Sequence, residues 1–416
     1  MPARTRLADA LPVLRIRPLR LLLAGQWVSF IGDALFPVAL AFAVLDELHG
    51  TPAQLGLVLA AQAAPLSLLV LASGVWADRL DRRRLMLASD IGRTVVQAAV
   101  AALLLGGVAE LWMLVVLVAF YGTFEALFRP AAGGLVPQLA GPDHLQQANA
   151  LLGLGQNAGL VLGPSLAGVL IVAVGPGAAI AVDAATFAVS TLALLALRVP
   201  PAAVATAEAP GPTGFWAELK GGIDEVRQRR WMWSFMPAFT AYHLVALPCV
   251  LALGPVISVR ELDGAASWAT IVTCFGAGTI LGGLLALRVR PGRPMLVCAL
   301  CFLGAACQPV IVALGGSTAV IAALELAAGV AVATGFTQWE TTLGREIPAR
   351  ALSRVTSLDW FTTAGAMPLG FALVAGAADA LGTRTVMLAS AAIVMVLVLA
   401  CLAVGDVRRL RREPAG

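Results

Sequence analysis

Charged residues are scarce in this chain. Asp, Glu, Lys and Arg make up only 12% of its 416 residues, whereas soluble domains carry about 25%. There are only three histidines, and the sequence has no clustered metal ligands, no nucleophile elbow and no glycine-rich phosphate loop with a lysine. These absences argue against a membrane-embedded enzyme or sensor and exclude an ATP-driven pump. We expect the protein to need neither a cofactor nor a metal ion.

Apolar residues dominate instead. Hydrophobic residues account for 59% of the chain, and its mean hydropathy is +0.88, which is more apolar surface than a soluble core can use. A helix needs about 20 apolar residues to cross a bilayer, and continuous apolar runs favour helices over alternating strands. Twelve windows meet this condition: 18–45, 52–76, 85–106, 110–136, 145–174, 177–197, 231–259, 265–287, 294–314, 317–343, 353–380 and 384–405. We therefore predict an all-α integral membrane protein with twelve transmembrane helices.

Basic residues determine the expected orientation. Of the 28 Lys and Arg residues, all but four fall at the termini or in loops that join even-numbered windows to odd-numbered ones. Arg260 and Arg384 lie in the opposite loops, and Arg93 and Arg129 lie inside windows. Because cationic loops stay in the cytoplasm, we expect both termini there, in a multi-pass protein of the inner or plasma membrane. The net charge of +4 is then a topology signal, and nucleic acid is not an expected partner.

All six cysteines fall inside the apolar windows. Cys298 and Cys301 have the spacing of a redox or metal-binding pair, but on an apolar helix we expect them to be small packing residues. The sequence therefore predicts no metal site.

A stretch poor in charge separates the sixth window from the seventh. Residues 199–214 are rich in Pro, Ala and Gly, which is typical of a flexible linker. The next stretch, 215–231, spaces apolar residues at helical intervals with charges between them, which predicts a short helix on the cytoplasmic membrane surface. We therefore divide the chain into a six-helix bundle at 1–198, a linker with its amphipathic helix at 199–230, and a second six-helix bundle at 231–416.

The two predicted bundles share a weak internal repeat. One glycine and two arginines recur with unchanged spacing, as Gly74, Arg79 and Arg84 and again as Gly283, Arg288 and Arg293. Five leucine and glycine positions within 145–166 also recur with unchanged spacing within 352–373, and Gly163 is matched there by Gly370. Chance matching remains an alternative for this second set. Two segments shifted by nearly the same amount indicate homologous halves, an architecture typical of transporters whose substrate site lies between the halves.

The stretch GVWADRLDRRR, residues 74–84, carries a family resemblance. It resembles the signature of the major facilitator superfamily, in which a glycine, an Asp-Arg pair, a second glycine position and two or three basic residues join the second and third helices. Six residues match it: Gly74, Asp78, Arg79, Arg82, Arg83 and Arg84. Asp81 stands where the second glycine is usual. The resemblance implies two six-helix bundles and secondary active transport by alternating access.

The fifth window contains a second motif, GLVLGPSLAG, which resembles the antiporter motif of the superfamily's exporters. Four positions match it: Gly159, Gly163, Pro164 and Gly168. The stretches GQWVSFIGD and LFRPAAGGLVPQL resemble the branch that contains the enterobactin exporter and macrolide efflux proteins. Glycines at every fourth position also allow two helix backbones to approach closely, so generic packing explains them nearly as well as antiport does.

We expect residues 78–84 to form a seven-residue cytoplasmic loop that acts as a conformational latch. Asp78 can hold Arg79 or Arg82 while facing the positive end of a helix in the other half, which stabilises one of the two states of alternating access. The alternative is that the arginines only fix orientation, but this does not explain Gly74 or Asp78. Taken from both halves, the latch set is Gly74, Asp78, Arg79, Arg82, Arg83, Arg84, Gly283, Arg288 and Arg293.

Charged residues deep inside the windows are the candidate transport residues, because charge at bilayer depth is rare and mostly functional. Asp33 lies far inside the first window with no cation near it in the sequence, so we expect it to bind and release a proton as a central cavity opens to each side. A cap or a hydrogen bond to a neighbouring helix is the alternative role. Glu125 and Arg129 lie one helical turn apart and predict an intramembrane ion pair that lines the cavity. Glu125 is the alternative to Asp33 as the carboxylate that binds the proton.

The remaining charges in the windows are weaker candidates. We expect Asp90 and Arg93, one turn into the third window, only to brace the Asp78 loop. Glu325 is the deepest acid of the second half. Aromatic residues such as Tyr121 either line an apolar cavity or face lipid.

Together these features predict a proton-coupled efflux transporter for a small, moderately apolar molecule such as a drug, a macrolide or a siderophore. We expect a monomer in the lipid bilayer, with the small molecule and protons as its partners and no enzymatic activity. An importer or a lipid flippase on the same fold is the main alternative, although the antiporter-like motif favours export. A membrane-embedded sensor or enzyme is the alternative from another class.

Overall fold

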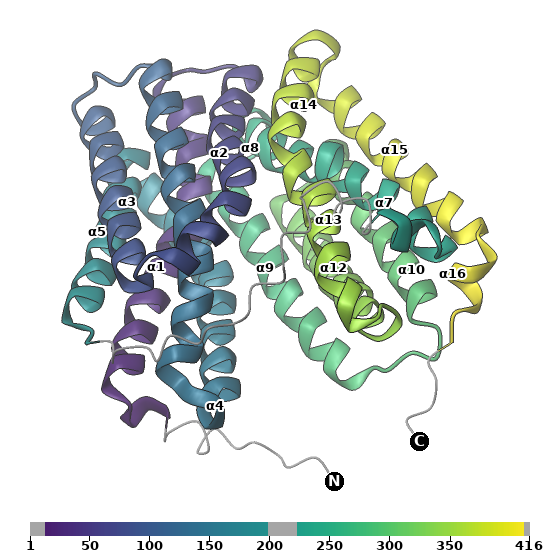
Figure 1. Ribbon diagram of the computed structural model, residues 1–416. Coiled ribbons are helices and arrows are strands. Elements are labelled where there is room, and N and C mark those ends of the chain that lie inside the picture. The colour runs from purple at the N-terminus through teal and green to yellow at the C-terminus, as the bar shows by residue number, and fades with distance from the viewer. Residues whose placement is uncertain (1–12, 199–222, 412–416) are drawn as a thin grey trace. The chain divides into compact units, whose positions relative to one another are not determined.

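The predicted all-α class is confirmed. The computed structural model describes residues 13–198 and 223–411, with the backbone alone at 70–79, 349–350 and 353. All regular structure within these ranges is helical, and no strand occurs in them (Figure 1).

The chain divides into two compact units. The first comprises Met1–Gly50 and Ala61–Thr206, and the second comprises Thr51–Ala60 and Ala207–Gly416. The predicted linker at 199–214 lies outside the described residues, so the proposed six-helix bundles at 1–198 and 231–416 stay predictions. Of the predicted surface helix at 215–231, residues 215–222 also lie outside the described part, and residues 223–227 are helical.

In the first unit, two helices each pack against the same two others. In chain order the helices of this unit are η2 Val13–Arg15, α1 Arg17–Phe42, the π-helical turn η3 Ala43–Glu47, α2 Pro52–Arg79, of which residues 52–60 belong to the second unit, α3 Arg82–Leu105, α4 Leu111–Val174 and α5 Pro176–Ala196. Helix α1 packs against α4 and α5, and α3 packs against the same two helices (Figure 1). This arrangement brings residues of α1, α3, α4 and α5 together although they are far apart in the sequence.

Helix α4 consists of two helical segments that meet at Gly141. Its backbone there has φ 64° and ψ 174°, a conformation that glycine adopts at no steric cost. The two segments correspond to the predicted windows 110–136 and 145–174. Within the described residues, eleven helices are long and apolar enough to cross a membrane, and α4 counts once among them. The count of twelve spans and the side on which the termini lie stay predictions.

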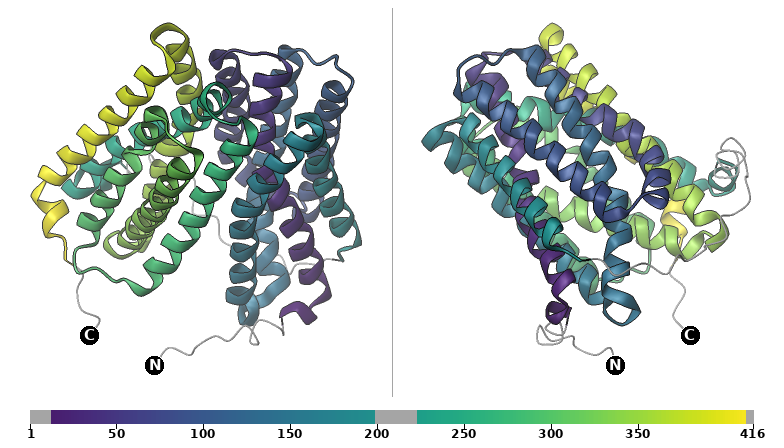
Figure 2. Two further views of the ribbon diagram at one scale, coloured as in Figure 1. Left: turned by 180° about the vertical axis from the view of Figure 1, so that it is seen from behind. Right: turned by 60° about the vertical axis from the view of Figure 1, so that its left-hand side comes forward.

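The second unit contains the helices of the second half of the chain. They are α7 Arg230–Ala241, the π-helical turn η4 Tyr242–Ala246, α8 Leu247–Glu261, α9 Ala265–Arg288, α10 Pro294–Ala306, α11 Gln308–Leu314, α12 Thr318–Glu346, α13 Ala349–Thr363, the 3-10 turn η5 Ala364–Ala366, α14 Met367–Leu381, α15 Thr383–Ala403 and α16 Gly405–Arg409. Helix α12 packs against α9 and α10, and α15 packs against α7, α10 and α11 (Figure 2).

Exposed and buried apolar residues together indicate a membrane protein. Many large apolar side chains are exposed on the helix surfaces, among them Leu68 (74%) and Leu287 (73%), and apolar surface of this extent is rare on soluble monomers. In a bilayer these side chains contact lipid instead of water, so the unfavourable free energy of hydrating apolar surface does not arise. The core of the second unit is aromatic, with the ring centroids of Phe239 and Phe302 4.4 Å apart and Trp339 buried beside them.

The sequence repeat has a counterpart in packing. A Cβ at Gly163 on α4 would lie 2.7 Å from the carbonyl oxygen of Ile31, on the first membrane helix of its unit. A Cβ at the repeat-matched Gly370 on α14 would meet the carbonyl oxygen of Leu244 and lie 2.7 Å from Cγ of Pro248. These two residues belong to the first membrane helix of the second unit. Matched glycines therefore make the same kind of close approach in each unit.

Candidate functional site

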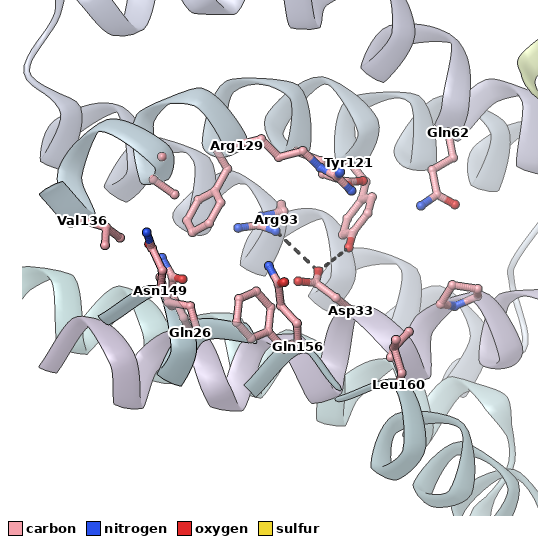
Figure 3. Close-up of a pocket in the computed structure, with 18 residues that line it drawn as sticks. Gln26, Asp33, Gln62, Arg93, Tyr121, Arg129, Val136, Asn149, Gln156 and Leu160 are labelled. Carbon is pink, nitrogen blue, oxygen red and sulfur yellow. Dashed lines mark hydrogen bonds and ion pairs between the residues drawn. The ribbon is translucent and has the colours of Figure 1, made fainter. Parts of the chain in front are cut away.

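A cavity of about 660 Å³ lies within the first unit. Pockets that hold drug-sized ligands typically measure about 300–1,000 Å³. Its walls come from α1, α2, α3 and both segments of α4 (Figure 3). The lining residues are Gln26, Phe30, Asp33, Ala34, Pro37, Gln62, Arg93, Tyr121, Glu125, Phe128, Arg129, Ala132, Gly133, Val136, Asn149, Leu152, Gln156 and Leu160.

Helical spacing explains why these side chains share one cavity. Residues three or four apart lie on the same face of a helix. Gln26, Phe30 and Asp33 follow one another at such intervals on α1, and so do Asn149, Leu152 and Gln156 on the second segment of α4. Each helix therefore turns a stripe of mixed polar and apolar residues toward the cavity.

Asp33 lies at the meeting point of three helices. Its Oδ1 accepts a hydrogen bond from the Tyr121 hydroxyl at 3.0 Å and lies 3.5 Å from Nη1 of Arg93 (Figure 3). The side chain is 34% exposed, and it lines the cavity. The sequence places no cation near Asp33, but the fold does: Arg93 is 60 residues away in the sequence and reaches it from α3.

Two carboxylates and two aromatic rings surround the guanidinium group of Arg93. Its Nη2 lies 2.5 Å from Oδ1 of Asp90, and its guanidinium carbon lies 4.3 Å from the ring centroid of Phe128 and 4.2 Å from that of Phe187. Asp90 also accepts a hydrogen bond from the Ser190 hydroxyl at 2.6 Å. Arg93 therefore bonds to carboxylates on α1 and α3 while two rings cover its faces, an arrangement that guanidinium favours. The expectation that Asp90 and Arg93 only brace the Asp78 loop missed this role.

A second buried polar pair extends the site toward α5. Asp183 on α5 is fully buried, and its Oδ2 accepts a hydrogen bond from Nε2 of Gln97 on α3 at 2.6 Å. The Thr186 hydroxyl lies 3.4 Å from the other carboxylate oxygen. A Cβ at Gly32, next to Asp33, would collide with Asp183 and Thr186. Glycine at this position lets α1 approach α5 closely.

The predicted ion pair between Glu125 and Arg129 is present. Nη2 of Arg129 lies 2.6 Å from Oε1 of Glu125, and the exposed fractions of the two side chains are 61% for Arg129 and 15% for Glu125. Both residues line the cavity. Together with Asp33 and Arg93, they give the cavity wall two carboxylates and two guanidinium groups.

The second unit has a polar network of its own. The Tyr242 hydroxyl donates to Oε1 of Gln308 at 2.7 Å, and Nε2 of Gln308 donates to Oε2 of Glu325 at 3.0 Å. All three residues are buried. The sequence singled out Glu325 by its depth, but it did not predict that Gln308 and Tyr242 bond to it in a chain. Tyr242 and Gln308 lie where the first and third membrane helices of this unit are interrupted.

A family model for the Major Facilitator Superfamily matches residues 22–370. The chain belongs to this superfamily. Members of this superfamily are transporters and not enzymes. The prediction of a multi-pass membrane transporter is therefore confirmed.

Several relatives of this superfamily member carry efflux names. Macrolide efflux protein A of Streptococcus pyogenes is 25% identical over 397 residues, which cover 93% of this chain and 96% of that protein. The multidrug efflux pump Tap of Mycolicibacterium fortuitum is 25% identical over 395 residues, covering 89% and 92%. An uncharacterized MFS-type transporter, YfiS of Bacillus subtilis, is 31% identical over 279 residues, but the match spans only 65% of this chain and 63% of YfiS.

Solved transporter structures share the fold. The nucleoside transporter NupG (D323A mutant) has a TM-score of 0.75 at 13% identity, covering 93% of this chain and 99% of that one. A bacterial homologue of the iron transporter ferroportin has a TM-score of 0.70 at 17% identity, covering 94% and 98%.

The superfamily's loop signature differs here from the expected geometry. The predicted seven-residue loop is shorter, because α2 extends through Asp78 to Arg79 and α3 begins at Arg82. Asp81, which replaces the usual glycine, is the N-cap of α3, and its Oδ1 accepts from the backbone N–H of Arg84 at 2.8 Å. At Gly74, Asp78 and Arg79 only the backbone belongs to the described part of the chain.

Two arginines of the signature bind carbonyl groups of the first unit. Arg82 donates to the Gly134 carbonyl at 2.7 Å, and Arg83 donates to the carbonyls of Leu194 and Leu195 at 2.8 and 2.9 Å. The last carbonyls of a helix lack partners within it, so Arg83 caps the end of α5. The sequence interpretation considered a latch and orientation and missed this capping role.

The second-half signature residues lie at comparable helix ends. Arg288 is the last residue of α9, as Arg79 is of α2, and Arg293 directly precedes α10. No other residue within 13–198 and 223–411 forms a hydrogen bond or ion pair with the side chain of Arg288 or Arg293. Their role in a latch, like that of Gly283, stays a prediction.

The glycines of the antiporter-like motif form a close seam with α1. A Cβ at Gly159 would lie 2.6 Å from the carbonyl oxygen of Phe30, and one at Gly163 would lie 2.6 Å from Cβ of Ala34. Pro164 and Gly168 are buried on the same helix. The predicted close packing is confirmed, whereas the antiport role of the motif stays a prediction.

Proposed function

We propose that this superfamily member is a proton-coupled exporter of a small, moderately apolar molecule such as a drug, a macrolide or a siderophore. One observation carries the proposal: a carboxylate, Asp33, lines a drug-sized cavity while contacting helices α3 and α4 through Arg93 and Tyr121. Carboxylates placed inside a membrane protein at such contacts typically serve ion or proton pathways.

Proton binding at Asp33 would change its contacts with two helices at once. The carboxylate accepts from the Tyr121 hydroxyl and attracts Arg93. When a proton neutralises Asp33, the attraction to Arg93 falls, and Arg93 keeps its closer partner, Asp90, at 2.5 Å. Proton binding therefore alters how α1 is held against α3 and α4. We infer that this change couples the proton to the opening of the cavity, and that Glu125 and Arg129 form a second charge pair along the path.

The proposed topology has twelve spans in two six-helix bundles, with both termini in the cytoplasm. The kink at Gly141 supports it, because it divides α4 into two segments of membrane-spanning length. The distribution of basic residues supports the orientation. Two bundles that rock about a central site give alternating access. We propose that the protein works as a monomer.

Export is favoured over import by two observations. The relatives that match nearly the whole chain, macrolide efflux protein A and Tap, are named as efflux proteins. The antiporter-like motif at 159–168 forms the close seam between α1 and α4. An importer or a lipid flippase on this fold would move cargo in the opposite direction or move lipid instead.

Transport into inverted membrane vesicles tests the proposal. With the cytoplasmic face outward, an acidic lumen should drive uptake of a macrolide or dye by the wild-type protein, and a protonophore should abolish it. Asp33→Asn should abolish the gradient-driven uptake at unchanged protein level. Asp143→Asn, an exposed acid outside the cavity, is the matched control and should transport normally. Full gradient-driven uptake by Asp33→Asn would remove Asp33 from the mechanism.

A further inference from the structure

Four carboxamide side chains line the cavity of the first unit without a protein partner. Gln26 comes from α1, Gln62 from α2, and Asn149 and Gln156 from the second segment of α4. None of these side chains forms a hydrogen bond with another residue within 13–198 and 223–411. Each carboxamide offers two N–H donors and one carbonyl acceptor.

Gln26 is the most informative of the four. It is only 4% exposed, and its Nε2 is buried without any hydrogen-bond partner. A buried donor without a partner costs stability, so native proteins rarely keep one. A half-turn of the carboxamide exchanges its nitrogen and oxygen, so a bound molecule can satisfy either end. In Figure 3, the Gln156 side chain points toward the same space as Asp33 and Arg93.

The charges of the cavity wall are already paired with one another. Asp33 lies 3.5 Å from Arg93, and Glu125 lies 2.6 Å from Arg129. The described lining residues thus contain two acids and two bases. A cargo that enters this cavity therefore meets no unpaired charge of either sign among them, whereas it meets four amides that are free to bond.

We propose that the cavity recognises its cargo through these amides, and that the cargo is a polyoxygenated amphiphile. Such a molecule carries several hydroxyl, ether or carbonyl oxygens on one edge and hydrocarbon on the other, and it needs no net charge. Phe30, Leu152 and Leu160 supply the apolar wall for its hydrocarbon edge. Gln26 and Gln156 are the specificity-determining residues. The inference rests on the proposed function only in taking this cavity as the cargo site.

Direct binding to the purified full-length protein in lipid nanodiscs tests the inference. Two probes are compared by equilibrium dialysis: erythromycin, a macrolide rich in hydroxyl and ether oxygens, and tetraphenylphosphonium, an apolar cation without hydrogen-bonding groups. Gln156→Leu and Gln26→Leu should each weaken erythromycin binding by about fivefold, the effect of one lost hydrogen bond, and leave tetraphenylphosphonium binding unchanged. Gln146→Leu, an exposed glutamine of α4 that does not line the cavity, should change neither.

A conservative variant separates hydrogen bonding from side-chain size. Gln156→Asn keeps a carboxamide and should retain more erythromycin affinity than Gln156→Leu. Unchanged erythromycin affinity in both leucine variants, equal losses for the two probes, or tighter wild-type binding of tetraphenylphosphonium than of erythromycin would overturn the inference, as would binding of neither probe. Because transport is not measured, a failure of proton-driven efflux would reject the proposed function alone.

Discussion

Arg93 on α3 lies 3.5 Å from Asp33 on α1 and 2.5 Å from Asp90 on its own helix. One guanidinium therefore forms ion pairs with two carboxylates that differ in their exposure. Asp33 is 34% exposed and faces the cavity, whereas Asp90 is fully buried. A change in the charge of Asp33 alters one of these contacts and leaves the other in place, which makes Arg93 the connection between the cavity and the interior of the first unit.

Replacing Arg93 should destabilise the protein more than replacing the cavity's other arginine. Arg93→Ala leaves Asp90 buried beside no cation within the described part of its surroundings, and breaking a buried ion pair typically costs about 3–5 kcal/mol. Arg129→Ala removes a side chain that is 61% exposed, for which the typical cost is about 1 kcal/mol or less. Thermal unfolding of both variants in the same detergent measures the difference. Equal melting temperatures would contradict the assigned role of Arg93.

Tyr121→Phe should impair transport while it preserves the fold. The hydroxyl donates to Asp33, and one hydrogen bond contributes about 1 kcal/mol. The ring keeps its packing against Phe36, with the centroids 4.8 Å apart. We expect a gradient-driven efflux rate reduced by about two- to tenfold, in line with that energy, at an unchanged protein level. An efflux rate equal to that of the wild type would show that this hydrogen bond has no part in transport.

The seam between α1 and α4 should not tolerate even one methyl group. In Gly159→Ala, the new Cβ would lie 2.6 Å from the Phe30 carbonyl oxygen, and overpacking of this kind typically costs about 1–3 kcal/mol. Gly153→Ala, on the same helix but with open space around the new Cβ, is the matched control. Thermal unfolding should place Gly159→Ala below both the wild type and this control. If the two variants unfold together, the close approach is not needed for stability.

The sequence identified the helices well because hydrophobic length is a local property. The apolar windows and the described helices agree closely, as at 265–287 and α9, Ala265–Arg288. The windows 110–136 and 145–174 leave residues 137–144 as a connection, whereas the structure is helical up to Gly141 and again directly after it. Hydrophobicity alone therefore does not locate the ends of these helical segments. The predicted loop at 78–84 was too long, because charged residues extend a helix into water as readily as they form a loop.

The site was only partly predictable, because its contacts depend on how helices are placed beside one another. Depth alone selected Asp33, and the spacing of one helical turn predicted the pair of Glu125 and Arg129. The contact between Asp33 and Arg93 depends on the register between α1 and α3, which no local pattern encodes. One signal was present: Arg93 and Asp90 lie three residues apart inside an apolar window, and such a pair is costly in lipid unless it serves a purpose.

The most direct test of the central claim, that Asp33 carries the coupled proton, counts protons moved per cargo. In liposomes that contain the purified protein and a pH-sensitive dye, an outward cargo gradient should drive opposing proton movement by the wild type. Asp33→Asn should exchange labelled cargo across the membrane at equal concentrations yet move no protons. Cargo-driven proton movement by Asp33→Asn at the wild-type ratio would contradict the account.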